Sequence, residues 1–338
     1  MYKILQKLLF LLPPETAHHF SLKSISFLNH IGILKLIKPK SVTKDIEVMG
    51  IKFPNRIGLA AGLDKDGEYI QALSNLGFGF IEIGTVTPRP QPGNPAPRLF
   101  RLPKANAIIN RMGFNNKGID YLTDNVANTR KSGFTGIIGI NIGKNIDTAV
   151  DDATEDYLIG LRNAYRYADY ITINISSPNT PGLRSLQYGN ELDKLLSAIK
   201  KEQLSLVASQ KKYVPIAVKV APDLSGDEIN DIAKTLLNIG IDCLIATNTT
   251  LSRDAVIGMK HGEEQGGLSG APVREMSTAV IKQFHEILKD EIPIIGVGGI
   301  SSAQDVQDKL DAGAVLVQVY SGLIYEGPTL VRSCVSKL

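Results

Sequence analysis

The segment between residues 174 and 184 carries the densest set of groups that could do chemistry. It reads NISSPNTPGLR and directly follows the apolar stretch 170–173. Hydroxyl and amide side chains therefore stand where a buried strand ends, and polar loops held by a rigid strand often carry function. In isolation, a capped turn in which Ser and Asn satisfy backbone groups explains the segment equally well. The rest of the chain has to decide between these two interpretations.

The composition is that of an ordinary globular protein with a sizeable core. The chain has 338 residues, of which 43% are hydrophobic and 21% charged, and one barrel-sized domain with an extension fits this length better than two domains. A net charge of +3 without an arginine-rich patch excludes a nucleic-acid partner. The five histidines and two cysteines lack the spacing of metal ligands, so we expect no metal site. Cys243 and Cys334 lie far apart, which favours free thiols and a reducing, cytosolic setting.

Residues 1–40 differ from the rest of the chain in charge and pattern. They contain six lysines and one acidic residue, Glu15, so their net charge is +5 and that of residues 41–338 is −2. The apolar residues between 4 and 12 stop at Pro13 and Pro14, which is too short for a membrane span, and no signal-peptide cleavage site follows. We expect two short helices, the second from about Pro14. A basic, amphipathic pair is typical of membrane-surface helices, and capping of the main domain is the alternative.

From residue 45 onward the pattern becomes regular. Two short strands, 46–49 and 51–53, are predicted around a turn at Gly50. Eight short buried strands follow, at 57–61, 80–84, 137–141, 170–175, 215–220, 243–247, 294–297 and 315–320. Amphipathic helices alternate with them, at 68–76, 155–167, 192–208, 226–237, 273–288 and 302–310. This alternation predicts an α/β fold, a (β/α)8 TIM barrel with a short N-terminal helical extension. The intervals 86–136 and 249–293 exceed one helix, and we expect insertions there over the top of the barrel.

Active sites of this fold lie at the carboxyl ends of the strands, where every predicted strand here delivers a polar group or bare backbone. A lone Asn or Thr after a strand is usually a helix cap. Eight such ends, with Lys65 and Lys219 among them, indicate a binding site instead. The runs 296–300 and 320–322 follow the last two strands, where barrels commonly bind a phosphate. Without a G-x-G-x-x-G motif or a P-loop, a mononucleotide-like cofactor with one phosphate is the simplest inference, although sugar-phosphate isomerases and aldolases use the same place.

Several motifs together carry a resemblance to a known family. They are AAGLDKDG at 60–67, EIGTVTP at 82–88, NRMGFNN at 110–116, the 174–184 loop, IATNTT at 245–250 and GGLSG at 266–270. This combination resembles dihydroorotate dehydrogenase nearly end to end, including the N-terminal helices. The resemblance implies an FMN-dependent barrel enzyme that oxidises (S)-dihydroorotate to orotate in pyrimidine synthesis.

The family divides by its catalytic base. Membrane-associated, quinone-reducing class 2 enzymes use a serine, and soluble class 1 enzymes use a cysteine. The motif position here is Ser177, which implies class 2. Residues 1–40 would then be the membrane and quinone segment, and residues 41–338 the FMN-binding catalytic domain. We accordingly expect a monomer bound peripherally to the cytoplasmic face of the cell membrane.

Two rival functions fit the sequence less well. A class 1 enzyme using fumarate or NAD is opposed by the serine and by the basic N-terminus. A non-redox barrel, such as an isomerase, an aldolase or a silent nucleotide-binding barrel, would normally want a Glu or His base, and none is visible on the rim.

The resemblance also implies the site residues, with Ser177 as the catalytic base. FMN would be bound by Ala61, Gly62, Leu63, Asp64, Lys65, Thr85, Asn141, Asn174, Lys219, Thr247, Gly270, Gly299, Tyr320 and Ser321. Dihydroorotate would be bound by Lys65, Asn110, Arg111, Met112, Gly113, Phe114, Asn174, Asn179, Asn248 and Thr249. His18, Arg101 and Tyr320 match positions that line a quinone tunnel, whereas His19 is expected beside it on the surface.

The residue types suit the chemistry of a pyrimidine oxidation. Lys65 can neutralise the substrate carboxylate, and Lys219 can stabilise negative charge on a reduced flavin. Asn side chains match the alternating donors and acceptors of a pyrimidine ring. A serine hydroxyl is a poor base, so we hypothesise that Thr180, or a water it orients, relays the proton from Ser177 while Phe114 shields the site. Ser176 is expected to be structural.

Overall fold

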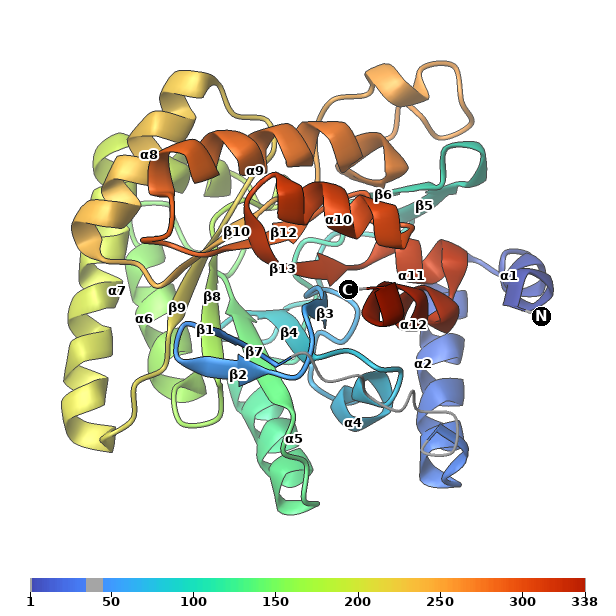
Figure 1. Ribbon diagram of the computed structural model, residues 1–338, viewed down its shortest axis with the longest axis horizontal. Helices are drawn as coiled ribbons and strands as arrows, with labels where there is room; N and C mark the ends of the chain where they lie inside the picture. The colour runs from blue at the N-terminus through green and yellow to red at the C-terminus, as the bar shows by residue number, and fades with distance from the viewer. Residues whose placement is uncertain (1, 35–44, 338) are drawn as a thin grey trace.

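The computed structural model describes residues 2–34 and 45–337, and its centre is a closed barrel of eight parallel strands (Figure 1). The strands, in their order around the barrel, are β3 (Ile57–Leu59), β4 (Phe80–Val86), β7 (Ile137–Ile142), β8 (Tyr170–Asn174), β9 (Ile216–Val220), β10 (Cys243–Ala246), β12 (Ile294–Val297) and β13 (Ala314–Val319). Pairing of β13 with β3 closes the ring. The predicted barrel is confirmed, and each predicted strand lies within two residues of its observed bounds.

Helices surround the barrel on its outside (Figure 1). They are α4 (Ile70–Ser74), α5 (Ile119–Lys131), α6 (Ala153–Ala164), α7 (Gly189–Gln210), α8 (Gly226–Ile239), α9 (Arg274–Leu288), α10 (Ala303–Asp311), α11 (Ser321–Glu326) and α12 (Pro328–Lys337). Helix α8 begins with a capping box, because the Ser225 hydroxyl accepts from the backbone N–H of Glu228 while the Glu228 carboxylate accepts from the backbone N–H of Ser225. The α4 helix is shorter than the predicted 68–76.

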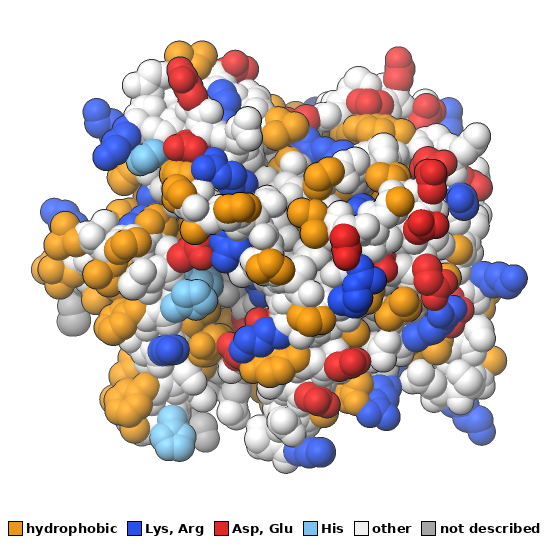
Figure 2. Space-filling view, turned by 180° about the vertical axis from the view of Figure 1, so that it is seen from behind, with side chains coloured by type: hydrophobic (Ala, Val, Ile, Leu, Met, Phe, Trp, Pro, Cys, Tyr) orange, Lys and Arg blue, Asp and Glu red, His pale blue; other side chains and the backbone are white. Residues whose placement is uncertain are grey.

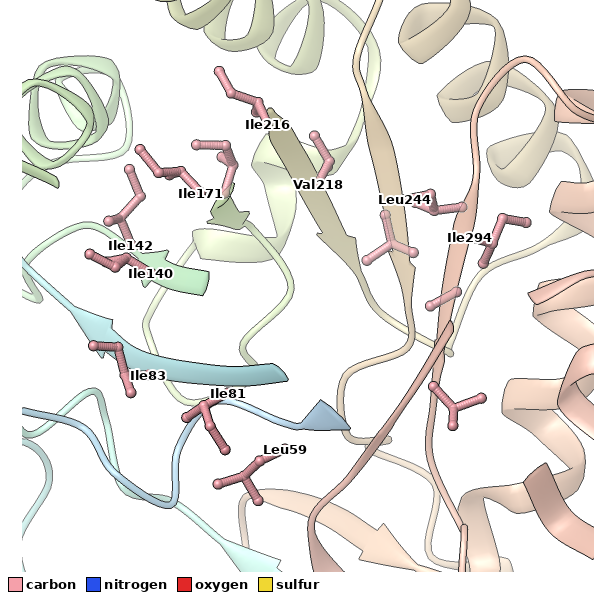
Figure 3. Close-up of a cluster of buried hydrophobic side chains, with 14 of the residues drawn as sticks. Leu59, Ile81, Ile83, Ile140, Ile142, Ile171, Ile216, Val218, Leu244 and Ile294 are labelled. Carbon is pink, nitrogen blue, oxygen red and sulfur yellow. The ribbon is translucent and has the colours of Figure 1, made fainter. Parts of the chain in front are cut away.

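Alternation along each strand separates two environments. Outward-facing side chains such as Ile81, Ile83, Ile140 and Ile142 fill the layer between strands and helices (Figure 3). Inward positions of the same strands carry Glu82 on β4 and Asn141 on β7. The strands are therefore apolar on the outside, where they meet helices, and partly polar on the inside, where they approach the site.

The amino ends of the strands are sealed by aromatic rings and by a hairpin. Strands β1 (Ile46–Val48) and β2 (Ile51–Phe53) pair as predicted around Gly50, whose φ is 72°. Phe53 packs edge-on against Phe80 with centroids 5.1 Å apart, and Phe80 packs likewise against Tyr170. Gly139 makes room for this stack, since a Cβ there would lie 2.1 Å from the Tyr170 ring. This end of the barrel is therefore filled.

The two predicted insertions meet in one small sheet. Strands β5 (Leu99–Leu102) and β6 (Ala107–Asn110) come from the first insertion, and β11 (Gly267–Gly270) comes from the second. β6 lies between the other two, antiparallel to both, with Asn110 opposite Gly267. Two segments far apart in sequence thus form a single cover, which brings residues 110–114 to the mouth of the barrel.

The N-terminal segment forms the predicted pair of helices, α1 (Tyr2–Leu9) and α2 (Pro14–His30). Helix α1 lies beside α11 near the other end of the chain (Figure 1), where the Tyr2 hydroxyl donates to the carbonyl of Ile324 at 2.7 Å. Helix α2 is tied to the first insertion by an ion pair of 2.9 Å between Glu15 and Arg98. Within residues 2–34 and 45–337, no helix is long and apolar enough to cross a membrane. The predicted boundary between residues 40 and 41 lies outside the described residues.

Candidate active site

A cavity opens where the carboxyl ends of the strands meet the small sheet of β5, β6 and β11. It is lined by most of the residues predicted to bind cofactor or substrate, or to act as the base: Ala61, Gly62, Lys65, Thr85, Asn110, Met112, Gly113, Phe114, Asn174, Ser177, Asn179, Lys219, Thr247, Asn248, Thr249, Gly270, Gly299, Tyr320 and Ser321. These residues come from the carboxyl ends of every barrel strand except β7 and from both insertions. Four predicted residues do not line the cavity: Leu63, Asp64, Arg111 and Asn141.

Two of these four shape the loop after β3. Leu63 is buried in the apolar core. The Asp64 carboxylate accepts from the backbone N–H groups of Glu68 at 2.9 Å and Tyr69 at 2.8 Å. Burial raises the pKa of Asp64 to about 6, even though these two hydrogen bonds favour the charged form. Asp64 therefore stabilises the turn that presents Lys65.

Arg111 and Asn141 support the cavity from outside it. Arg111 forms an ion pair of 2.8 Å with Glu264, and its guanidinium lies 4.6 Å from the centroid of Phe100. Asn141 is completely buried behind Thr85, whose hydroxyl donates to Asn141 Oδ1 at 2.6 Å. Asn141 thus holds Thr85, which lines the cavity, whereas the partners of Arg111 lie outside the cavity.

Side-chain amides form a connected network along one wall of the cavity. Asn174 Nδ2 donates to Thr85 Oγ1 at 2.9 Å and to Asn141 Oδ1 at 3.1 Å. Asn174 Oδ1 accepts from the backbone N–H of Ser176 at 3.3 Å, from the Ser176 hydroxyl at 3.2 Å and from Asn248 Nδ2 at 3.4 Å. Asn174 is therefore held at both ends of its amide, so this wall presents donors and acceptors in a defined order.

The loop after β8 turns its polar groups toward the same cavity. Ser177 is 5% exposed, and its hydroxyl oxygen accepts from the backbone N–H of Asn179 at 3.2 Å. Asn179 Nδ2 donates to Asn110 Oδ1 at 3.2 Å, which joins this loop to β6. The Thr180 hydroxyl is buried without a hydrogen-bond partner among the described residues. A loop that could have been a capped turn is instead part of the cavity wall.

Two lysines line the cavity in addition to the amide network. Burial lowers the pKa of Lys65 to about 8, with a further contribution from Arg98. Burial also lowers the pKa of Lys219, while the carboxylate of Glu82 opposes that shift. Among the described residues, neither ammonium forms an ion pair within 4.0 Å. Two cations without anionic partners at one cavity indicate an anionic ligand.

Glycines shape the side of the cavity formed by the last two strands. Gly298 and Gly299 have positive φ values of 121° and 73°, and a Cβ on Gly299 would lie 2.4 Å from the backbone of Arg274. Next to them, the hydroxyls of Ser269 and Ser321 lie 2.8 Å apart. Small residues and free backbone leave space for a phosphate-sized group at this place.

Sequence reasoning missed several residues that line the cavity. They are Ala60, Ser269, Val273 and Gln318, whereas Val297, Gly298, Ile300 and Gly322 belong to the two runs predicted to bind a phosphate. Gln318 is the most informative, because it is 1% exposed and its Oε1 has no hydrogen-bond donor among the described residues. Strand alternation contains the signal, since Gln318 lies two residues before Tyr320 on the same strand face.

Of the three residues predicted to line a quinone tunnel, only one also lines this cavity. Tyr320 lines the cavity, whereas His18 and Arg101 do not. The Arg101 guanidinium lies 4.5 Å from the centroid of Phe10 and donates to the carbonyl of Leu9 at 3.2 Å. Burial, aided by Lys65, lowers the pKa of His18 to about 3. Arg101 therefore joins β5 of the small sheet to the end of α1, and His18 on α2 lies close enough to the charge of Lys65 to be affected by it.

Comparison with known proteins agrees with this architecture. The family model described as "Dihydroorotate dehydrogenase" matches residues 44–338. A protein of Cellvibrio japonicus named "Dihydroorotate dehydrogenase (quinone)" is 57% identical over 98% of this chain and 96% of its own length, and one of Acinetobacter baylyi with the same name is 56% identical over 100% and 99%. A crystal structure of Eimeria tenella DHODH in complex with ferulenol matches with a TM-score of 0.87 and 37% identity over 96% of this chain and 90% of that one. The chain therefore belongs to the dihydroorotate dehydrogenase family.

Proposed function

We propose that the protein oxidises dihydroorotate to orotate in pyrimidine biosynthesis, with FMN in the barrel cavity and a membrane quinone as the final electron acceptor. One observation carries the proposal. Four side-chain amides (Asn110, Asn174, Asn179 and Asn248), one lysine (Lys65) and one serine (Ser177) line a single cavity at the mouth of the barrel. These groups complement a flat ring that carries a carboxylate and alternating N–H and C=O groups.

The proposed cofactor is FMN, which when bound would accept the hydride from the substrate, and three features of the cavity support it. Gly298 and Gly299 leave backbone open for a phosphate, and Lys219 is a buried cation without an anionic partner among the described residues. Gln318 Oε1 has no hydrogen-bond donor among the described residues, so it can accept a hydrogen bond from the cofactor. Of the residues predicted to hold FMN, we assign direct contact to those that line the cavity and a supporting role to Leu63, Asp64 and Asn141.

Ser177 is the proposed base that removes a proton from the substrate ring. Its oxygen accepts from the Asn179 backbone N–H, which stabilises negative charge on that oxygen as the hydroxyl proton leaves. Thr180, three residues along the same loop, is buried and its hydroxyl lacks a partner among the described residues, so it can take part in passing that proton on. Phe114 lines the cavity and limits access of water.

The N-terminal helices are the proposed docking site for membrane and quinone, on the cytoplasmic side. Figure 2 shows hydrophobic side chains gathered along the edge that α1 and α2 form. Ile4, Leu8 and Leu11 are 67%, 59% and 82% exposed. Lys3, Lys7 and Lys23 lie among the same two helices, and this combination favours an anionic lipid surface. The proposed attachment is that of a monomer.

The experiment that tests the proposal is a spectrophotometric titration of the purified protein. We expect flavin absorbance that dihydroorotate bleaches in the absence of oxygen and that a quinone restores. If fumarate or NAD restores the flavin absorbance and a quinone does not, quinone is not the electron acceptor. A colourless protein, or a flavin that dihydroorotate never bleaches, would refute the proposal as a whole.

A further inference from the structure

A buried carboxylate lies beneath the cavity, inside the barrel. Glu82 is on β4, has no exposed surface and does not line the cavity. Three donors converge on its two oxygens: Asn141 Nδ2 at 2.8 Å on Oε1, and Tyr170 Oη at 2.9 Å and Gln318 Nε2 at 2.6 Å on Oε2. A carboxylate in the interior of a barrel is costly unless its oxygens are satisfied by hydrogen bonds, as they are here.

A carboxylate constrains its neighbours because an ionised one can only accept. Asn141 must turn its NH2 group toward Glu82, so its Oδ1 faces Thr85 and Asn174. Gln318 must likewise turn its NH2 group toward Glu82, which leaves Oε1 without a donor among the described residues. Thr85 does not fix the orientation of Asn141, because its hydroxyl rotates, and the Tyr170 hydroxyl, to which Gln318 also donates, can rotate as well.

The orientation reaches the cavity wall through Asn141. If Asn141 turned over, its NH2 group would face the NH2 group of Asn174, whose own oxygen is held by the backbone N–H of Ser176. Two donors would then oppose each other, and Asn174 would have to leave its place. The hydrogen bonds that link Glu82, Asn141, Asn174 and Ser176 therefore have a single arrangement of donors and acceptors. The Glu82 carboxylate fixes this arrangement at one end, and the Ser176 backbone N–H fixes it at the other.

We propose that Glu82 is a positioning residue for this cavity, whose carboxylate holds Asn141 and Gln318 in single orientations so that Asn174 and Gln318 present defined atoms to the bound molecules. This inference rests on the proposed function for the identity of those molecules. It assigns Glu82 no contact with substrate or cofactor. Glu82 is also the anionic group that opposes the effect of burial on Lys219.

The substitution Glu82→Gln tests the role, because a glutamine has a single acceptor oxygen where the carboxylate has two. Either Asn141 or Gln318 must then turn over. We expect kcat/KM for dihydroorotate to fall by about 10- to 100-fold, mainly through KM, and the dissociation constant of orotate measured by calorimetry to rise by a similar factor. The flavin absorbance bands should shift, since the polar groups around the ring change.

A double variant provides a rescue that a general structural role does not predict. When Glu82→Gln is combined with Asn141→Asp, the introduced amide at position 82 donates to the introduced carboxylate at position 141 and accepts from Gln318 and Tyr170. Each remaining amide thus regains its original direction, and the total charge is unchanged. We expect orotate affinity to recover to within about fivefold of wild type.

Tyr170→Phe is the matched control, because it removes one donor to Glu82 and a 3.3 Å bond from Gln318 but keeps the bonds by which Asn141 and Gln318 donate to Glu82. It should change kcat/KM by less than about threefold while lowering the melting temperature. A larger effect on kcat/KM would show that any disturbance of Glu82 damages the cavity, which contradicts a role confined to the two amides.

Each outcome decides the proposal. Glu82→Gln with wild-type orotate affinity overturns it, and so does an impaired single variant that the double variant fails to rescue. If the single variant does not fold, a folded and active double variant supports the role, whereas failure of both overturns it. The proposed function fails separately, by a wild-type protein that binds no flavin or that dihydroorotate does not reduce.

Discussion

The guanidinium of Arg184 and the carboxylate of Asp223 form an ion pair of 2.9 Å that joins the loop after β8 to the loop after β9. The same guanidinium donates to the backbone carbonyl of Ser176 at 3.1 Å and to that of Thr249 at 2.8 Å. Loops after three neighbouring strands are thus held by one side chain. Two of the three contacts are to the backbone of the segments that carry Ser177 and Thr249 into the cavity.

Replacement of Arg184 by lysine should therefore damage the site while keeping the charge. A lysine ammonium is a single point and cannot span three acceptors in the way a planar guanidinium does. We expect Arg184→Lys to lower kcat/KM for dihydroorotate by about tenfold or more, because the loop carrying Ser177 loses its attachment. Arg162→Lys is the matched control, since the Arg162 guanidinium likewise bridges more than one acceptor, Glu155 and Glu202, but neither of these lines the cavity. Equal kinetics for both variants would contradict the assignment.

The two serines of the loop should respond differently to removal of their hydroxyls. Ser177→Ala should slow flavin reduction by about 10²- to 10⁴-fold with little change in orotate affinity, because it removes the proposed base. Ser176→Ala should mainly raise KM, because the Ser176 hydroxyl donates to Asn174 and accepts from Asn248 at 3.0 Å. Stopped-flow reduction and orotate titration separate the two effects. The reverse pattern would move the base to Ser176.

Thr180→Val tests the proton relay with little change in side-chain volume. The valine removes a buried hydroxyl that has no hydrogen-bond partner among residues 2–34 and 45–337, so the melting temperature should stay constant or rise. Flavin reduction should nevertheless slow, while orotate binding is unchanged. Wild-type reduction kinetics in Thr180→Val would exclude Thr180 from the relay.

Substrate binding should depend on pH through Lys65. Burial lowers its pKa to about 8, so the ammonium is charged below that value and loses its charge as the pH rises through it. The dissociation constant of orotate should be flat at lower pH and increase as the pH passes this pKa, because the substrate carboxylate loses its counter-charge. Lys65→Arg should abolish this dependence, since arginine stays charged throughout. A flat profile in the wild type would show that Lys65 does not bind the carboxylate.

Membrane attachment should depend on the exposed apolar residues of α1, α2 and the turn between them. Leu11→Asp should weaken binding to anionic vesicles by about tenfold or more, because a buried leucine contributes roughly 1.5–3 kcal/mol and the new charge repels the lipid. Ile257→Asp is the control, since Ile257 is 74% exposed but lies in the second insertion, outside the N-terminal segment 2–30. Vesicle co-sedimentation at two salt concentrations separates the apolar from the electrostatic contribution. Equal losses for the two variants would contradict an oriented attachment.

Much of the fold was predictable because its determinants are local. The eight strands and the pair of N-terminal helices are marked by apolar runs and by Pro13, Pro14 and Gly50. The strand ends identified most of the cavity lining, because parallel strands must bring their carboxyl ends to one side. The family motifs extended the prediction to residues 110–114, whose place over the barrel depends on pairing between β6 and β11.

Sequence alone therefore determined the strands, their direction and the polar groups at their ends, since each depends on residues close together in the chain. Only the tertiary structure decided which polar groups meet. In the sequence Glu82 is one residue of a buried strand, yet it is bonded to Asn141, Tyr170 and Gln318 from three other strands. Likewise, α1 lies beside α11 from the far end of the chain. Such contacts follow from closure of the barrel, which joins β13 to β3 and sets inward-facing side chains opposite one another across distances that no local pattern encodes.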